Sequence, residues 1–395
     1  MPKIRLSDAE YARRRTAILE RLAEHQLDAL VVFLPQNVSY FSRFHFIPTE
    51  RPIVLVLAPS TTALLVPRLE QEHAEEFALV ERIRSYPEYP DLRHPLEFLR
   101  DLLQELSLDR GRLGVDADGY PQLYGYRGPK LSDLLPNAHL RIVTDEIEHL
   151  QMINSPEELE LLRESARWAN LAHALLQEYC RPGASETEVA MRASYEASQA
   201  MLRALGPDYR PHAGELAVAG FRGQIGKASA WPHATTSNAR MQPGDILVTG
   251  ATAAVWGYGC ELERTMILGE PTPEQERFFT LMLAAQDLAL QTIKPGIPCA
   301  AVDRAVREFF REHGLEAYWR HHTGHAKSTQ VHEPPFLDIG DERVIEVGMV
   351  FTVEPGIYVP DLGGFRHSDT VAVTPDGIEM ITYYPRDLAS LVIPV

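Results

Sequence analysis

Two glutamates in a strand-like segment have the residue type and spacing to do chemistry. Glu261 and Glu263 stand two positions apart in the run Tyr258–Thr265. Because side chains alternate between the two faces of a strand, both carboxylates are expected on one face, with Leu262 and Arg264 on the other. Two like charges held side by side raise one another's pKa, or they share a cation or a metal ion. A solvated strand face with a stray acid pair is the plain alternative.

Four further segments combine imidazole or carboxylate side chains with turn-forming residues. They are Trp231–Ala234, His321–Glu333, Met349–Tyr358 and Gly363–Asp369. Glu354 stands out among them, because an acid in a run of Val, Phe, Thr and Val is expected to be buried and then needs a partner. Each segment also has an ordinary interpretation as a surface or core histidine, a strand end or a glycine turn.

The elements that position these residues lie in the second part of the chain. A capping box at Ser155–Glu158 opens a long helix that is expected to end near Cys180. The preceding residues, 1–150, begin with a capped helix after Ser7 and then alternate strand-like and helix-like segments. That alternation is typical of a small mixed α/β domain.

The second part of the chain contains one arrangement twice, about 115 residues apart. A capped helix, a Pro-Gly stop, a second helix and strand-rich sequence follow one another in both copies. The stops are Pro182-Gly183 and Pro295-Gly296, and the capped helices open at Ser155 and Thr272. The repetition predicts two similar αβ halves that face each other. Coincidence is the alternative, because Pro-Gly commonly ends a helix.

Composition narrows the class of protein. A chain of 395 residues with a net charge of −17 is long enough for two domains and disfavours nucleic acid and anionic membranes as partners. The charge suits a cationic or zwitterionic small substrate. Three cysteines without a CxxC pair indicate a reducing compartment. The N-terminus turns polar at once, and no apolar run approaches the roughly 20 residues of a membrane span. We therefore expect a cytoplasmic protein.

Taken together and in this order, the motifs resemble the creatinase, aminopeptidase P and prolidase superfamily, which has the pita-bread fold. The resemblance extends over nearly the whole chain. It implies an α+β fold of two domains: a small mixed α/β creatinase-type N-terminal domain over residues 1–150, and a pita-bread catalytic domain of two pseudo-symmetric αβ halves over residues 151–395. It also implies a homodimer.

Metallopeptidases of this superfamily hold two divalent ions with two Asp, one His and two Glu. Carried over by position, the five ligands fall on Gly250, Glu261, His325, Glu354 and Ser368. Glycine has no ligating side chain and serine is a poor ligand, so the resemblance disfavours a two-metal centre. If an ion binds, the remaining ligands are Glu261, His325 and Glu354.

The metal-free branch, creatinase, matches more positions. Its working acid lies in a Leu-Glu-Arg-Thr segment and maps to Glu263, and its catalytic histidine, eleven residues before a Gly-Asp turn, maps to His233. Its second binding-site glutamate maps to Glu354. Two substrate-reading positions differ: an arginine of that family falls on Phe336, and an N-terminal aromatic residue falls near Thr49. Creatine is therefore not the expected substrate. The predicted substrate-binding residues are His325, His332, Arg366, Tyr258, Phe336 and Arg51.

These assignments predict a metal-independent hydrolase that cleaves a C–N bond of a small guanidino, amidino or cyclic amidine or amide compound. Glu263 and Glu354 are expected to hold the cationic group and His233 to act as general acid and base. Glu261, with a raised pKa, is expected to be a second proton donor. Direct attack by a carboxylate is an alternative route. No cofactor is expected.

Two other functions remain open. A metal-dependent Xaa-Pro dipeptidase or aminopeptidase would use Glu261, His325 and Glu354 for a single Mn or Co ion, with other histidines of His321–His332 as spare ligands. A catalytically inactive pita-bread domain would be a binding module. The retention of acids and histidines at the site positions counts against the inactive domain.

Overall fold

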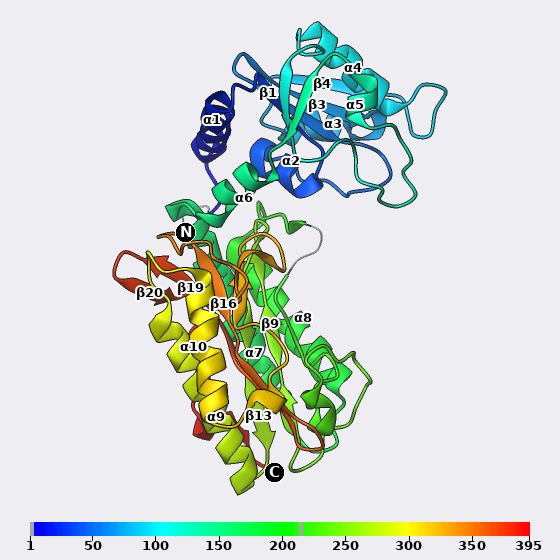
Figure 1. The fold of residues 1–395 in the computed structure, drawn as a ribbon. Helices are drawn as coiled ribbons and strands as arrows, with labels where there is room; N and C mark the ends of the chain where they lie inside the picture. Colours follow the sequence, from blue (N-terminus) through cyan, green and yellow to red (C-terminus); the bar gives the residue numbers. More distant parts are fainter. Residues whose placement is uncertain (1–3, 213–215) are drawn as a thin grey trace. The chain divides into compact units, whose positions relative to one another are not determined.

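The computed structural model describes residues 4–212 and 216–395, and the chain divides into two compact units (Figure 1). One unit comprises Leu6–Gln151. The other comprises Met152–Val395 together with Ile4 and Arg5. In the described parts of the chain, no helix is both long enough and apolar enough to cross a membrane.

The N-terminal unit is built around a six-stranded sheet in the order β4-β3-β2-β1-β5-β6. The strands are β1 (Ala29–Val32), β2 (Val54–Ala58), β3 (Thr61–Pro67), β4 (Arg82–Tyr86), β5 (Arg112–Val115) and β6 (His139–Ile142). The helices are α1 (Asp8–Glu24), α2 (Pro35–Ser42), α3 (Gln71–Phe77), α4 (Pro95–Glu105), α5 (Leu131–Leu134) and α6 (Thr144–Met152). Alternate residues of β1 enter hydrophobic clusters on opposite faces: Ala29 and Val31 in one, Leu30 and Val32 in the other. Burial on both faces explains why this strand is apolar throughout.

Two helix pairs of the larger unit confirm the predicted repeat. The helices are α7 (Pro156–Tyr179), α8 (Glu186–Leu205), α9 (Pro273–Thr292), α10 (Cys299–Glu312) and the short α11 (Leu388–Leu391). Helix α7 packs on α8, and α9 packs on α10. Each pair is followed in sequence by strands of one shared sheet, so the two halves have the same element order.

Helix capping agrees with the sequence at Ser7, Ser155 and Thr272. Ser155 and Thr272 form complete capping boxes at the starts of α7 and α9. The segment Ser185–Glu188 also has the capping-box pattern and predicts a box at the start of α8, but Ser185 makes no capping bond, so that prediction is wrong. Its hydroxyl donates instead to Asn238 Oδ1 at 2.5 Å, while the Glu186 carboxylate accepts bonds from backbone amides of a neighbouring loop. A tertiary contact has replaced the local one.

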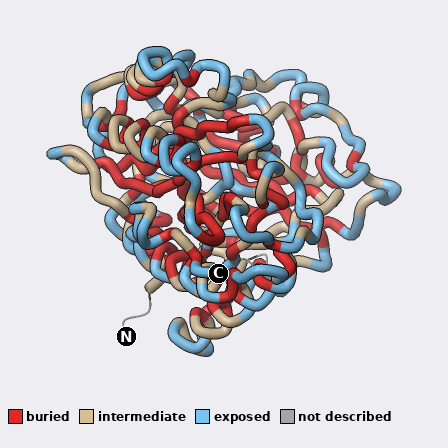
Figure 2. The backbone as a smooth tube through the Cα atoms, turned by 90° about the horizontal axis from the view of Figure 1, so that it is seen from below, coloured by how far each residue is buried: buried red, intermediate tan, exposed pale blue. Residues whose placement is uncertain are grey.

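The halves of the larger unit share a sheet in the order β15-β14-β16-β19-β12-β9-β7, with β20 beside β19. The strands are β7 (Val218–Gly220), β9 (Gly250–Thr252), β12 (Leu262–Glu263), β14 (Gly324–Ala326), β15 (Glu333–Leu337), β16 (Val350–Val353), β19 (Ser368–Thr374) and β20 (Gly377–Met380). The first half supplies β7, β9 and β12, and the second supplies the rest. They meet where β12 pairs antiparallel with β19. Buried segments, red in Figure 2, include every residue of β12, β14 and β16.

Smaller sheets complete this unit. Strands β8 (Ile246–Val248), β13 (Thr265–Leu268) and β21 (Val392–Ile393) form one, β10 (Ala254–Val255) and β11 (Tyr258–Gly259) a second, and β17 (Gly356–Val359) and β18 (Gly363–Arg366) a third. Glu261, Glu263, Glu354 and Arg366 therefore lie at or next to the ends of strands in the larger unit.

Candidate active site

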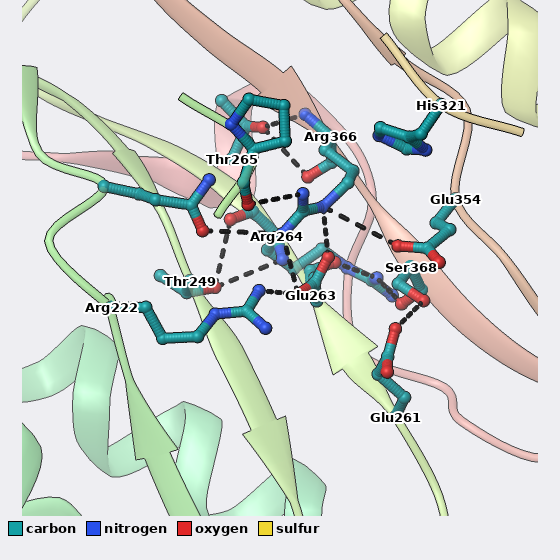
Figure 3. Close-up of polar contacts among 12 residues, drawn as sticks. Arg222, Thr249, Glu261, Glu263, Arg264, Thr265, His321, Glu354, Arg366 and Ser368 are labelled. Atoms are coloured by element: carbon teal, nitrogen blue, oxygen red, sulfur yellow. Dashed lines mark hydrogen bonds and ion pairs between the residues drawn. The ribbon is translucent and has the colours of Figure 1, made fainter. Parts of the chain in front are cut away.

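Glu263 lies at the end of β12 and forms ion pairs with two arginines, Arg222 and Arg366 (Figure 3). Its side chain is 2% exposed, and its Oε1 and Oε2 accept hydrogen bonds from the Arg366 guanidinium, one of them 2.9 Å long. Arg222 Nη2 donates a further bond to Oε1. The carboxylate predicted to hold a cationic substrate is thus already paired with two cations of the protein itself.

Arg366 is held rigidly by its neighbours. Besides Glu263, its guanidinium donates to the Tyr358 hydroxyl at 2.9 Å, and its Nε lies 3.8 Å from Glu354 Oε2. The Tyr358 hydroxyl also hydrogen-bonds with His321 Nε2 at 2.7 Å. Burial disfavours the charged guanidinium, yet Glu263 raises the pKa of Arg366 well above its usual value. Arg366 is therefore a fixed positive charge inside the site.

Arg222 was missed by the sequence reasoning. Its side chain is about half exposed, at 51%, and its backbone has a φ of 52°, a conformation uncommon for residues other than glycine. Only its end reaches the buried Glu263 carboxylate. No motif pointed to it, since it stands in a loop; the following glycine, Gly223, is the one local sign of a sharp turn.

Gly250, at the position of the first metallopeptidase aspartate, faces this ion pair. A Cβ added to it would lie 3.6 Å from Glu263 Oε1 and 3.7 Å from Arg222 Cζ. Those are ordinary van der Waals distances. A β-carbon would therefore fit, but a carboxylate beyond it would enter the space of the Arg222–Glu263 pair.

The side chains of Glu261, His325 and Glu354 converge beside this ion pair. One ligand atom each of Glu261, His325 and Glu354 all lie within 4.8 Å of one another. His325 Nδ1 donates to the Ala326 carbonyl at 2.9 Å, which orients the ring and leaves Nε2 facing the acids. Nε2 is buried, lies 3.4 Å from Glu354 Oε1 and makes no hydrogen bond with the described residues.

The electrostatics of this group are those of a cation site. Burial, then Glu354 and Glu263, raise the pKa of Glu261 to about 7. Burial opposes the charge of Glu354 too, but His325, whose Nε2 lies 3.4 Å from Glu354 Oε1, and the Arg366 charge lower its pKa to about 2. Two carboxylates and an orphaned imidazole nitrogen form a donor set suited to one divalent ion. The residues present therefore fit a single metal ion.

Two of the four mapped acidic ligand positions carry no carboxylate. Ser368 replaces the last metallopeptidase glutamate, and its hydroxyl donates to Glu261 Oε1 at 2.9 Å. Gly250 offers no side-chain ligand, and Glu263 is engaged by Arg222 and Arg366. Ser368 therefore orients the Glu261 carboxylate and does not supply a carboxylate of its own.

The remaining histidines and Phe336 lie beside the ligand group. The exposed ring of His332 stacks on His325, with centroids 3.9 Å apart and an interplanar angle of 15°. His233 is exposed and close enough to contribute to the lowering of the pKa of His332, which burial and His325 cause mainly. Phe336 packs on His322, with centroids 5.7 Å apart. Both line a surface depression of about 800 Å³.

Two predicted binding residues lie outside this group. The Tyr258 hydroxyl donates to Glu158 Oε1 at 2.8 Å, at the start of α7. Arg51 belongs to the N-terminal unit, where it pairs with Glu50 and Glu88. The substrate-binding roles of Tyr258 and Arg51 stay predictions.

Comparison with known proteins places the chain in a family. The model of "Metallopeptidase family M24" matches residues 160–375, and that of "Creatinase/Prolidase N-terminal domain" matches residues 14–153. The chain is 29% identical to the Xaa-Pro dipeptidase of Pyrococcus horikoshii, covering 94% of this chain and 97% of that protein. It is 32% identical to the uncharacterized peptidase YqhT of Bacillus subtilis over 66% of this chain and 70% of that protein.

Solved structures of similar proteins agree with this family assignment. The prolidase of Pyrococcus horikoshii OT3 superposes with a TM-score of 0.76 at 26% identity, covering 95% of this chain and 99% of that chain. Dipeptidase PepE of Mycobacterium ulcerans superposes with a TM-score of 0.82 at 28% identity, covering 99% of this chain and all of the other. These likenesses confirm the pita-bread fold and the two-domain α+β architecture predicted from the sequence.

Two sequence-based predictions are wrong. The metal-independent, creatinase-like C–N hydrolase is contradicted, because the relatives that match nearly the whole chain include Xaa-Pro dipeptidases and the similar structures include prolidases. The alternative peptidase interpretation agrees better with these relatives. The absence of a cofactor is contradicted by the metallopeptidase family match and by the convergence of Glu261, His325 and Glu354. The Leu-Glu-Arg-Thr segment led to the wrong prediction because Glu263, which was expected to hold a cationic substrate, is paired with arginines of the protein itself. The chain is thus an enzyme that belongs to metallopeptidase family M24, within the creatinase, aminopeptidase P and prolidase superfamily.

Proposed function

We propose that the protein is a metal-dependent Xaa-Pro dipeptidase or aminopeptidase whose single divalent ion is held by Glu261, His325 and Glu354. The observation that carries the proposal is the convergence of their ligand atoms within 4.8 Å around a buried His325 Nε2 without a hydrogen bond. Such a nitrogen costs free energy unless something binds it. The similarity to Xaa-Pro dipeptidases supports the substrate class.

A divalent ion bound there supplies Lewis acidity toward the scissile carbonyl and makes its bound water more acidic. The chain's own residues orient the ligands: the Ala326 carbonyl fixes the tautomer of His325, and the Ser368 hydroxyl fixes Glu261. The positive charge of Arg366, 3.8 Å from Glu354 Oε2, keeps that carboxylate ionised.

Hydrolysis of the C–N bond delivers hydroxyl to the carbonyl carbon and a proton to the leaving nitrogen. The exposed imidazole of His332, stacked on His325, is placed to carry that proton, and His233 is a second exposed imidazole near it. Both assignments are part of the proposal. A small peptide, zwitterionic at neutral pH, is the substrate class that this mechanism implies.

We also retain three predictions about the whole protein. They are a cytoplasmic location, a homodimeric assembly and a division into an N-terminal domain (1–150) and a catalytic domain (151–395). The supporting observations are the three cysteines without a CxxC pair and the superfamily resemblance.

The test is hydrolysis of Xaa-Pro dipeptides and Xaa-Pro-peptides by protein purified without chelator, assayed with Mn²⁺ and with EDTA. Activity is expected with Mn²⁺, is expected to disappear with EDTA, and is expected to be lost in His325→Ala. His313→Ala, in an exposed histidine after α10, is the matched control. Activity that is insensitive to EDTA, or full activity of His325→Ala, would refute the proposal.

A further inference from the structure

We infer that the place of the second ion of a two-metal M24 centre is taken in this chain by the guanidinium groups of Arg222 and Arg366, which clamp Glu263, so that the site accepts one divalent ion. This inference rests on the proposed function for the first ion, at Glu261, His325 and Glu354. It assigns Arg222, which no sequence motif identified, to the metal site as a positioning residue.

The first argument is spatial. Gly250 stands at the position of the first metallopeptidase aspartate, and a Cβ there would lie 3.6 Å from Glu263 Oε1 and 3.7 Å from Arg222 Cζ and Nη2. A ligand carboxylate carried by that Cβ would therefore lie beside an existing ion pair. The glycine leaves the space next to the pair without a side chain.

The second argument concerns the neighbouring strand. Glu263 on β12 lies directly opposite Ser368 on β19, the position of the last metallopeptidase glutamate. The Ser368 hydroxyl donates to Glu261 Oε1. A glutamate at this position would add a third carboxylate next to Glu261 and Glu263. The short, neutral side chain of Ser368 avoids that repulsion.

The third argument is charge. Glu263 and Glu354 carry two negative charges, and they face two positive charges, those of Arg222 and Arg366. Arg366 is 3% exposed and Glu263 is 2% exposed, so water screens their charges weakly. A divalent ion entering beside these two guanidinium groups would be repelled, most strongly by the buried Arg366, and Glu263 would not be free to bind it. The guanidinium groups of Arg222 and Arg366 therefore supply the positive charge that a second ion would bring.

The test counts ions per chain by elemental mass spectrometry, after soaking in Mn²⁺ and desalting, in three proteins. They are the native chain; the double variant Gly250→Asp/Ser368→Glu, which restores both missing acids; and the quadruple variant that adds Arg222→Ala and Arg366→Ala to remove both guanidinium groups. Arg304→Ala, in an exposed arginine of α10, is the control. Far-UV circular dichroism and the melting temperature establish which proteins are folded.

The inference expects one ion in the native chain and in the control, one in the double variant, and two in the quadruple variant. Two ions in the native chain or in the double variant would overturn it and leave the proposed function standing. A folded quadruple variant that holds only one ion would also overturn it. No ion in the native chain would refute the proposed function, and the inference with it. If the quadruple variant does not fold, the native chain and the double variant decide.

Discussion

Glu263 and Ser368 face each other across β12 and β19, the strands at which the two halves of the catalytic sheet meet. Each belongs to a different half, and each stands beside a residue of the proposed metal site. The Ser368 hydroxyl binds Glu261, whereas Glu263 is held by Arg366 and Arg222. The halves therefore position the site together, and changes at their junction are expected to affect stability and metal binding.

The buried ion pair at this junction is expected to be essential for stability. Arg264 Nη2 lies 2.8 Å from Asp369 Oδ1, and both side chains are fully buried. Asp369→Ala leaves a buried, uncompensated guanidinium and is expected to lower the free energy of unfolding by about 3–5 kcal/mol. Arg163→Ala, which removes an exposed pair with Glu379, is expected to cost at most about 1 kcal/mol. Urea unfolding measures both, and equal losses would contradict the prediction.

Metal binding is expected to stabilise the fold. An ion that binds only the native state raises the free energy of unfolding by about 2.7 kcal/mol at a concentration 100 times its Kd. We expect the melting temperature to rise with Mn²⁺ and to fall with EDTA in the native chain. The shift is expected to vanish in His325→Ala and to persist in His313→Ala. A shift that survives His325→Ala would place the ion elsewhere.

A buried histidine is expected to make the protein acid-sensitive. His173 is buried, hydrogen-bonds with Thr249 Oγ1 at 2.7 Å and packs against Tyr384 with the two rings tilted by 58°, and burial lowers its pKa to about 3. Between pH 6.5 and about 3 the unfolded chain binds a proton at this position that the folded chain does not, so stability falls as the pH falls. The slope is about 1.4 kcal/mol per pH unit for this one group.

The measurement compares native chain and His173→Gln at pH 6.5 and pH 5. The native chain is expected to lose about 2 kcal/mol more of its unfolding free energy than the variant over this interval. An equal loss in the two proteins would show that His173 is not the acid-sensitive group.

A glycine next to the proposed ligand His325 is expected to tolerate no side chain. A Cβ on Gly324 would overlap the backbone carbonyl of Thr352 on the neighbouring strand β16, which cannot move aside as a flexible side chain could. Gly324→Ala is expected to destabilise the protein by about 1–3 kcal/mol and to weaken Mn²⁺ binding by displacing His325. Gly220→Ala places its Cβ 3.5 Å from Ala190 Cβ, an ordinary contact, and is the control. Chemical unfolding and Mn²⁺ titration would show whether the two variants differ.

Much of the fold was readable because it depends on local or repeated signals. The capping boxes at Ser155 and Thr272 join residues three positions apart, so the sequence specifies them almost completely. The superfamily motifs, in their order, predicted the pita-bread fold, and they named Glu261, His325 and Glu354 as the ligands if an ion binds; these three side chains converge in the structure. These features rest on residue types at given positions along the chain.

The tertiary structure decided which hydrogen-bond and ion-pair partner each acidic side chain of the site has. The alternation of a strand places Glu261 and Glu263 on one face, but it does not show that a loop arginine, Arg222, reaches Glu263 or that Ser368 binds Glu261. Those contacts join residues 41 and 107 positions apart in sequence and depend on strand pairing and on the turn at Arg222. The charge state and role of a buried carboxylate follow from its neighbours in space, and for this reason the sequence motif alone led to the metal-free mechanism.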